Sequence, residues 1–174
     1  DVFITNFTRP AREKLGLRYE DLAAINDRLI YASLTAYGET GPEAAKTGFD
    51  STAYWARSGL MHMVRPDPDA TPARSLPGQG DHPTGVALFG AIALGLLHRE
   101  KTGRGTKVHS SLIANGVWSN AYFTQSILSG GTAPMRPRRE AMPNALTNHY
   151  RCRDGHWFIL SIVNQNKEWG ALVQ

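Results

Sequence analysis

The amino-acid sequence predicts an α/β fold: a partial doubly wound, Rossmann-like large domain built on a parallel sheet, followed by the start of a small α+β domain. Apolar, β-branched segments at residues 1–7 and 28–37 flank a helical pattern, which is the order of a βαβ unit. Residues 148–163 instead have the pattern of a β-hairpin. We therefore expect the large domain over residues 1–131, and a linker with the beginning of the small domain over residues 132–174.

The βαβ unit lies in the first quarter of the chain. "DVFITNF" predicts a short buried strand, because it is apolar and β-branched. Leu22 and Ile25 in "YEDLAAIN" have helical spacing, and acidic residues lie in the first turn. "RLIYASLTAY" predicts a second buried strand, parallel to the first.

Two loops and a helix come next. Residues 38–48 form a glycine-rich loop, and residues 64–80 contain four prolines and two glycines, a composition that excludes regular structure. Between them, "FDSTAYWARSGLM" predicts a helix, which Asp50 or Ser51 can cap and Gly59 can end.

The rest of the chain continues the alternation and then changes to the hairpin. "HPTGVALFGAIALGLLHRE" predicts a helix that is apolar on nearly all sides and therefore buried. "KVHSSLI" predicts a strand, and "ANGVWSNAYFTQSIL" predicts one helix. Residues 129–147 form a loop, Asp154-Gly155 turns the hairpin, and "NKEWGALVQ" begins a helix.

The composition is that of a globular protein, with 41% hydrophobic and 20% charged residues among 174. A formal net charge of +4 suits an anionic small molecule and does not require nucleic acid. Cys152 is the one cysteine, which excludes an internal disulfide and favours a cytoplasmic location. The longest strongly apolar run, residues 86–97, is too short to cross a bilayer. The chain begins without Met and ends in a helical pattern, so we expect a fragment of a longer protein.

Asp81 stands in "LPGQGDHPTG", between a glycine-rich turn and the apolar helix. Asp is a preferred N-cap and Pro83 suits the first helical turn, so capping is the simplest interpretation. A carboxylate at such a place can also act as a nucleophile, because the helix dipole and the free N–H groups stabilise anionic oxygen. From the residues alone both interpretations stay open, and the two roles are compatible.

Four segments follow one another along the chain: "DVFITNFTRPAREKLGLRYEDLAAINDRLIYASLTAYGETGP", "GDHPTG", "HREKTGRGTKVHSSL" and "YRCRDGHWFIL". Together they resemble the class III CoA-transferases, the family of formyl-CoA transferase and carnitine CoA-transferase. The resemblance runs over essentially the whole chain. It implies that this chain is under half of a family member and that the full-length protein forms an interlocked homodimer. It also implies that coenzyme A is part of the substrate. It implies no tightly bound cofactor, and the six histidines have no metal-ligand spacing.

The resemblance also implies roles for single residues. Asp81 falls at the family's catalytic aspartate. CoA binding is implied for Asn6, Arg12, Lys14, Tyr37 and Gly38, and substrate binding for Arg57, Gly80 and His82. The alternative to CoA binding by Arg12 and Lys14 is that they lie on a solvated basic surface. The alternative to substrate binding by Arg57 is a structural ion pair.

The implied function is an enzyme that moves CoA from an acyl-CoA thioester to a free carboxylic acid. In this family the reaction passes through aspartyl anhydride and aspartyl-CoA thioester intermediates. "FDSTAYWARSG" and "GDHPTG" look most like transferases for 2-hydroxy acids and their aromatic or enoyl products. The expected partners are an acyl-CoA, a carboxylic acid and a second copy of the chain, with no nucleic acid and no membrane.

Three alternatives stay open. An α-methylacyl-CoA racemase or epimerase is similar, but it pairs its aspartate with a histidine where this sequence has Phe49, which leaves His82 as a substitute. A nucleic-acid-binding module would explain the sequence pI of about 9.4 and the basic loop at residues 136–139, but it lacks a recognition helix. The third alternative is a non-catalytic fragment, since half of the CoA site is expected outside these residues.

Overall fold

The computed structural model describes all 174 residues, which form two compact units. The first unit contains Asp1–Met63 and Pro72–Ala133, and the second contains Val64–Thr71 and Pro134–Gln174. The division of a large from a small family domain after residue 131 stays a prediction.

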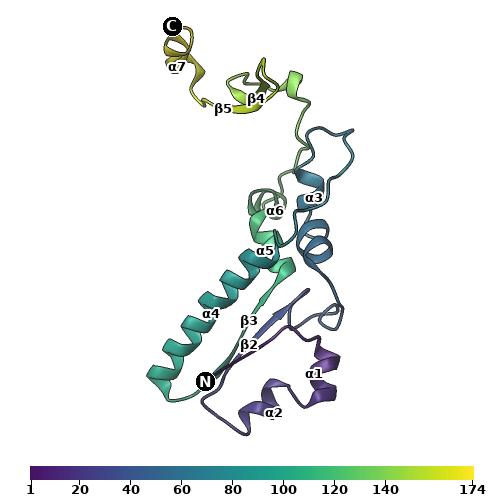
Figure 1. Cartoon of the computed structure of the whole chain (residues 1–174), viewed down its shortest axis with the longest axis vertical. Coiled ribbons are helices and arrows are strands. Elements are labelled where there is room, and N and C mark those ends of the chain that lie inside the picture. The colour runs from purple at the N-terminus through teal and green to yellow at the C-terminus, as the bar shows by residue number, and fades with distance from the viewer. The chain divides into compact units, whose positions relative to one another are not determined.

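The first unit is built on a three-stranded sheet in the order β1-β2-β3 (Figure 1). Its strands are β1 (Val2–Thr5), β2 (Ile30–Thr35) and β3 (Thr106–Ser111). Both neighbouring pairs are parallel, which confirms the predicted α/β fold with a parallel sheet. The prediction of a buried first strand is wrong: β1 is an edge strand, and Ile4 is 62% exposed.

Helices cover both faces of this sheet. Ile30 and Tyr31 are adjacent in β2, so their side chains point to opposite faces. On the Ile30 face lies α4 (Asp81–Thr102), where a Cβ added at Gly95 would be 3.2 Å from Ile30 Cγ2. On the Tyr31 face lie α1 (Arg9–Leu15) and α2 (Tyr19–Ala23), as in a doubly wound fold.

The core has two parts. In β2, Ile30, Tyr31 and Ala32 are completely buried, which confirms the predicted buried strand. A second cluster joins the residues that follow β2 to the π-helical segment η1 (Asp50–Ala56) and to α5 (Leu112–Ser119). Its buried members are Ala36, Ala53, Tyr54, Trp55 and Leu112.

The predicted helix at residues 49–61 is two elements. The π-helical η1 is followed by α3 (Leu60–Met63), and Gly59 separates them with a left-handed φ of 88°. Neither Asp50 nor Ser51 caps η1, because its N-cap is Phe49. The Phe49 amide donates to the Thr52 hydroxyl at 2.8 Å instead.

Two further predictions about helices are corrected. The predicted helix at residues 114–128 breaks at Asn120 into α5 and α6 (Ala121–Leu128). Helix α4 forms as predicted, but its expected burial is wrong, since only one side of it contacts the sheet. Val86 is 70% exposed and Phe89 is 73% exposed. Buried residues of α4 are Thr84, Leu88 and Gly95.

The second unit contains the predicted hairpin. Its strands β4 (Thr147–Arg151) and β5 (Trp157–Ser161) are antiparallel, and Gly155 in the connecting turn has a φ of 93°. A short 3₁₀ turn, η2 (Arg139–Ala141), precedes the hairpin and α7 (Gln165–Leu172) follows it. None of the helices combines the length and the hydropathy needed to cross a bilayer.

Candidate active site

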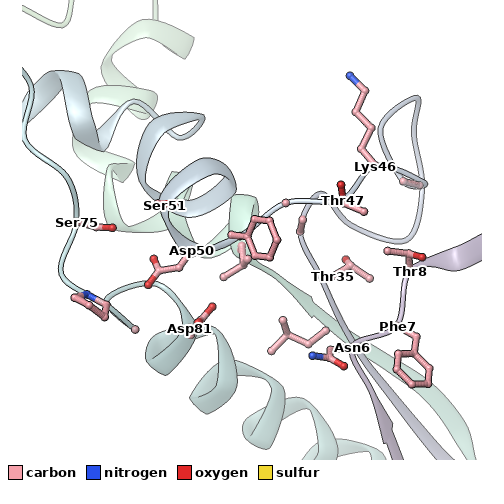
Figure 2. A pocket seen from close by; sticks show the side chains of 18 of the residues that line it. Asn6, Phe7, Thr8, Thr35, Lys46, Thr47, Asp50, Ser51, Ser75 and Asp81 are labelled. Carbon is pink, nitrogen blue, oxygen red and sulfur yellow. The ribbon is translucent and has the colours of Figure 1, made fainter. Parts of the chain in front are cut away.

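A cavity of about 580 Å³ opens at the carboxyl ends of the parallel strands (Figure 2). This is where ligands of open α/β sheets bind. Six segments form its wall: the residues after β1, the end of β2, the loop before η1, the start of η1, the loop that leads into α4 with the first residue of α4, and the start of α5. The polar and charged lining residues are Asn6, Thr8, Thr35, Lys46, Thr47, Asp50, Ser51, Arg74, Ser75 and Asp81.

Asp81 lines this cavity, and its carboxylate has no partner in the chain. It is the first residue of α4, its side chain is exposed, and it makes no hydrogen bond or ion pair with another residue. The alternative interpretation of Asp81 as the helix cap is wrong, because Gly80 holds the N-cap position and no side chain bonds the first turn. The positive end of the helix dipole favours negative charge at this point.

Gly80 fixes the backbone that carries Asp81. Its amide N–H donates to Asp50 Oδ1 at 2.9 Å. Gly80 itself is buried, and a Cβ built on it would overlap the ring of Tyr54. Gly80 does not line the cavity, so its predicted contact with the substrate stays a prediction.

Asp50 brings a second carboxylate to the same cavity. Figure 2 shows Asp50, at the start of η1, and Asp81, at the start of α4, close together at one end of the site. Asp50 Oδ2 is buried and has no hydrogen-bond partner. From the sequence, Asp50 was expected only as a helix cap. The one sequence signal for a role of Asp50 in the active site was its place directly after Phe49. Racemases of similar sequence carry a histidine at the position of Phe49.

Two cations also line the cavity, and they differ. Lys46 pairs with Glu43 at 2.8 Å, and its ammonium points away from Asp50 and Asp81 (Figure 2). Arg74 makes no ion pair or hydrogen bond through its side chain and is exposed. Arg74 was missed in the sequence, because it lies in a proline-rich loop that matches no motif.

The residues predicted to bind CoA are spread over the first unit. Asn6 lines the cavity. Tyr37 and Gly38 follow β2 and are half-buried, but they do not line the cavity. Lys14 is exposed on α1. For these residues the predicted CoA contacts stay predictions.

Arg12 is not part of a solvated basic surface, and that alternative is wrong. Its guanidinium pairs with Glu39 at 2.8 Å, and the two side chains are 4% and 7% exposed. Glu39 also accepts hydrogen bonds from Lys107 at 2.7 Å and from Ser33 at 2.8 Å. Burial alone would raise the pKa of Glu39, but the bonds from Arg12, Lys107 and Ser33 outweigh it and lower that pKa to about 2. Arg12 therefore has a structural partner, and its binding of a CoA phosphate stays a prediction.

The residues predicted to contact substrate are only partly at the cavity. Arg57 forms an ion pair with Glu43 at 3.0 Å and does not line the cavity, which agrees with the alternative of a structural ion pair. His82 is exposed, and its ring lies beside Gly78, a lining residue. No three His, Cys, Asp or Glu side chains lie together in an arrangement that could hold a metal ion.

The family model of CoA-transferase family III matches residues 1–174. The chain belongs to this family. Solved structures agree: a CAIB/BAIF family protein from Brucella suis superposes with a TM-score of 0.83 at 34% identity, over 99% of this chain and 44% of that one.

Two curated relatives show the range of activities in the family. The (R)-2-hydroxy-4-methylpentanoate CoA-transferase of Clostridioides difficile is 35% identical over 98% of this chain and 42% of its own length. The succinyl-CoA:glutarate CoA-transferase of Mus musculus is 40% identical over 67% of this chain and 26% of its own length. This chain therefore spans less than half the length of the relatives that it matches.

Proposed function

We propose that the protein containing this chain is a CoA-transferase that uses Asp81 as its nucleophile. The carboxylate of Asp81 supports this role, because it is free of protein partners and lines the cavity at the carboxyl ends of the strands. The position of Asp81 at the start of α4 adds the favourable field of a helix N-terminus. A purely structural carboxylate would have partners like those of Glu39.

The proposed reaction has two symmetrical halves. A carboxylate oxygen of Asp81 attacks the thioester carbonyl of the acyl-CoA, and the CoA thiolate leaves to give a mixed anhydride. The thiolate attacks the Asp81 carbonyl carbon, which releases the first acid and leaves an aspartyl-CoA thioester. The second acid attacks that thioester carbonyl through its carboxylate and expels the thiolate. The thiolate then attacks the acyl carbonyl of the new anhydride, which forms the new acyl-CoA and restores Asp81.

A 2-hydroxy acid is the proposed acid substrate. The relative from Clostridioides difficile, which matches 98% of this chain, is named for such an acid. Arg74 supports an anionic substrate, since its guanidinium faces no protein carboxylate and can bind a substrate carboxylate by two hydrogen bonds. The racemase alternative is weakened, because Phe49 lines the cavity where a proton-transferring histidine would be needed.

The proposed assembly is an interlocked homodimer in the cytoplasm. Apolar side chains on α4 support a covering partner, since Val86, Phe89 and Leu94 are 70%, 73% and 69% exposed in this chain. The free thiol of Cys152 is compatible with a reducing compartment.

The experiment uses the full-length protein that contains these 174 residues, with Asp81→Ala as the control. A 2-hydroxyacyl-CoA is offered together with one free acid at a time: 2-hydroxy-4-methylpentanoate, phenyllactate or glutarate. Chromatography of the CoA esters then measures transfer. We expect transfer to the two hydroxy acids, less transfer to glutarate, and none with Asp81→Ala. A preference for glutarate would contradict the substrate class, and hydrolysis without transfer would contradict the function.

A further inference from the structure

We propose that Asp50 is a positioning residue, which holds the Gly80 amide and so fixes the direction in which the Asp81 carboxylate enters the cavity. This inference rests on the proposed role of Asp81 as the nucleophile. It assigns to Asp50 a function at the reacting end of the site, without contact to the reacting atoms.

The contact joins two segments that are far apart in the sequence. The Gly80 N–H donates to Asp50 Oδ1 at 2.9 Å, across 30 residues. Because Asp50 begins η1 and Gly80 directly precedes α4, the bond ties the two helix starts together.

The same segment η1 holds Gly80 from a second side. The ring of Tyr54 lies where a Cβ of residue 80 would be, so no larger residue fits without movement. Tyr54 is itself fixed, since it is 5% exposed and its hydroxyl lies 3.0 Å from Ser119 Oγ. Gly80 is therefore held by a hydrogen bond and by packing, immediately before the nucleophile.

Asp50 has no other interaction that would explain its place. Its Oδ2 is buried and has no hydrogen-bond partner, so the bond to Gly80 is the single side-chain hydrogen bond of Asp50. A buried carboxylate oxygen without a donor lowers stability. Replacement of Asp50 consequently removes one defined interaction, which makes the role accessible to mutation.

Orientation matters greatly for an attack on a thioester. A displacement of about 1 Å at a reacting group can lower the rate about 100-fold. We expect Asp50→Ala to reduce kcat about 100-fold while the KM for acyl-CoA changes less than about threefold. Asp50→Asn keeps an acceptor oxygen for the Gly80 amide, so it should recover kcat to within about tenfold of the unchanged protein.

The test measures steady-state CoA transfer and the single-turnover rate of Asp81 acylation in the full-length protein. Asp27→Ala, at an exposed loop position whose side chain makes no hydrogen bond, is the matched control and should behave like the unchanged protein. Asp50→Leu, which has a similar size and no acceptor, accompanies Asp50→Ala. Thermal unfolding shows whether each variant folds.

The outcomes separate the two claims. If the unchanged protein transfers no CoA, the proposed function fails. If the unchanged protein transfers CoA and Asp50→Ala transfers it at the same rate, the positioning role of Asp50 is overturned and the proposed function stands. Equal losses in Asp50→Asn and Asp50→Ala would also overturn it, because the charge and not the bond to Gly80 would then be responsible. Failure of both acceptor-free variants to fold would make the bond a folding contact and overturn the inference as well.

Discussion

Glu39 and Asp81 are both carboxylates of the first unit, but their surroundings are opposite. Glu39 is 7% exposed and is bonded to Arg12, Lys107 and Ser33. Asp81 is exposed at a cavity and is bonded to no residue. A fully partnered charge stabilises the fold, whereas a charge without partners at a cavity is available for chemistry. The difference in partners favours a structural role for Glu39 and supports the proposed chemical role of Asp81.

Removal of the Asp81 carboxylate should abolish activity and leave the stability of the fold nearly unchanged. We expect Asp81→Ala to lower kcat at least about 1,000-fold, because the covalent route loses its nucleophile. The free energy of unfolding should change by less than about 0.5 kcal/mol, since the side chain has no partners. Transfer assays and denaturant unfolding of the full-length protein measure the two effects. A large loss of stability would mean that Asp81 is structural after all.

Removal of Arg12 should have the opposite profile. Arg12→Ala leaves the buried Glu39 without one of its two cationic partners, which lowers the free energy of unfolding by about 3 kcal/mol. Arg9→Ala is the matched control, because Arg9 pairs with Glu13 in an exposed pair and should contribute under about 0.5 kcal/mol. Denaturant unfolding at neutral pH compares them. Equal effects of the two substitutions would refute the structural role of the buried pair.

The ionisation of Glu39 should make the stability of the fold depend on pH. The pKa of Glu39 is lowered from 4.5 to about 2 in the folded protein, so its contribution is complete above pH 4.5 and is lost as the pH falls toward 2. Over that window the unchanged protein should lose about 3 kcal/mol more stability than Glu39→Gln, which cannot ionise. Unfolding measured at several pH values tests this. Parallel curves for the two proteins would contradict the lowered pKa.

The smallest expected effect concerns Arg74, the cation of the cavity without a protein partner. Arg74→Ala should raise the KM for the acid substrate about tenfold, which corresponds to the loss of one charge-assisted hydrogen bond. The rate at which acyl-CoA acylates Asp81 should stay the same, because that step precedes binding of the second acid. Steady-state and single-turnover kinetics separate the steps. An unchanged KM for the acid would remove Arg74 from the site.

The elements of the fold that depend on local patterns were predictable. The β-branched strand at residues 28–37, the apolar helix after Asp81 and the Asp154-Gly155 hairpin carry their signal in neighbouring residues. Burial was less predictable, because the sequence of α4 does not show what covers each of its sides. Its apolar residues were expected in a core, yet Phe89 is 73% exposed in this chain.

The arrangement of the site was predictable only in part. The motif around Asp81 identified the residue, but a shift of one position in the helix start decided that Gly80 and not Asp81 is the N-cap. Asp50 and Gly80 are 30 residues apart, and Arg12 and Glu39 are 27 apart. Such contacts depend on the packing of separate segments, and no local pattern in the sequence encodes them.

Trapping of a covalent intermediate on Asp81 tests the proposed nucleophile. The full-length protein is incubated with an acyl-CoA, treated with hydroxylamine or borohydride, and digested for peptide mass spectrometry. We predict a modification on Asp81 in the peptide that contains "GDHPTG", absent when acyl-CoA is omitted and absent in Asp81→Ala. An unmodified Asp81 in a protein that turns over acyl-CoA under the same conditions would contradict the account.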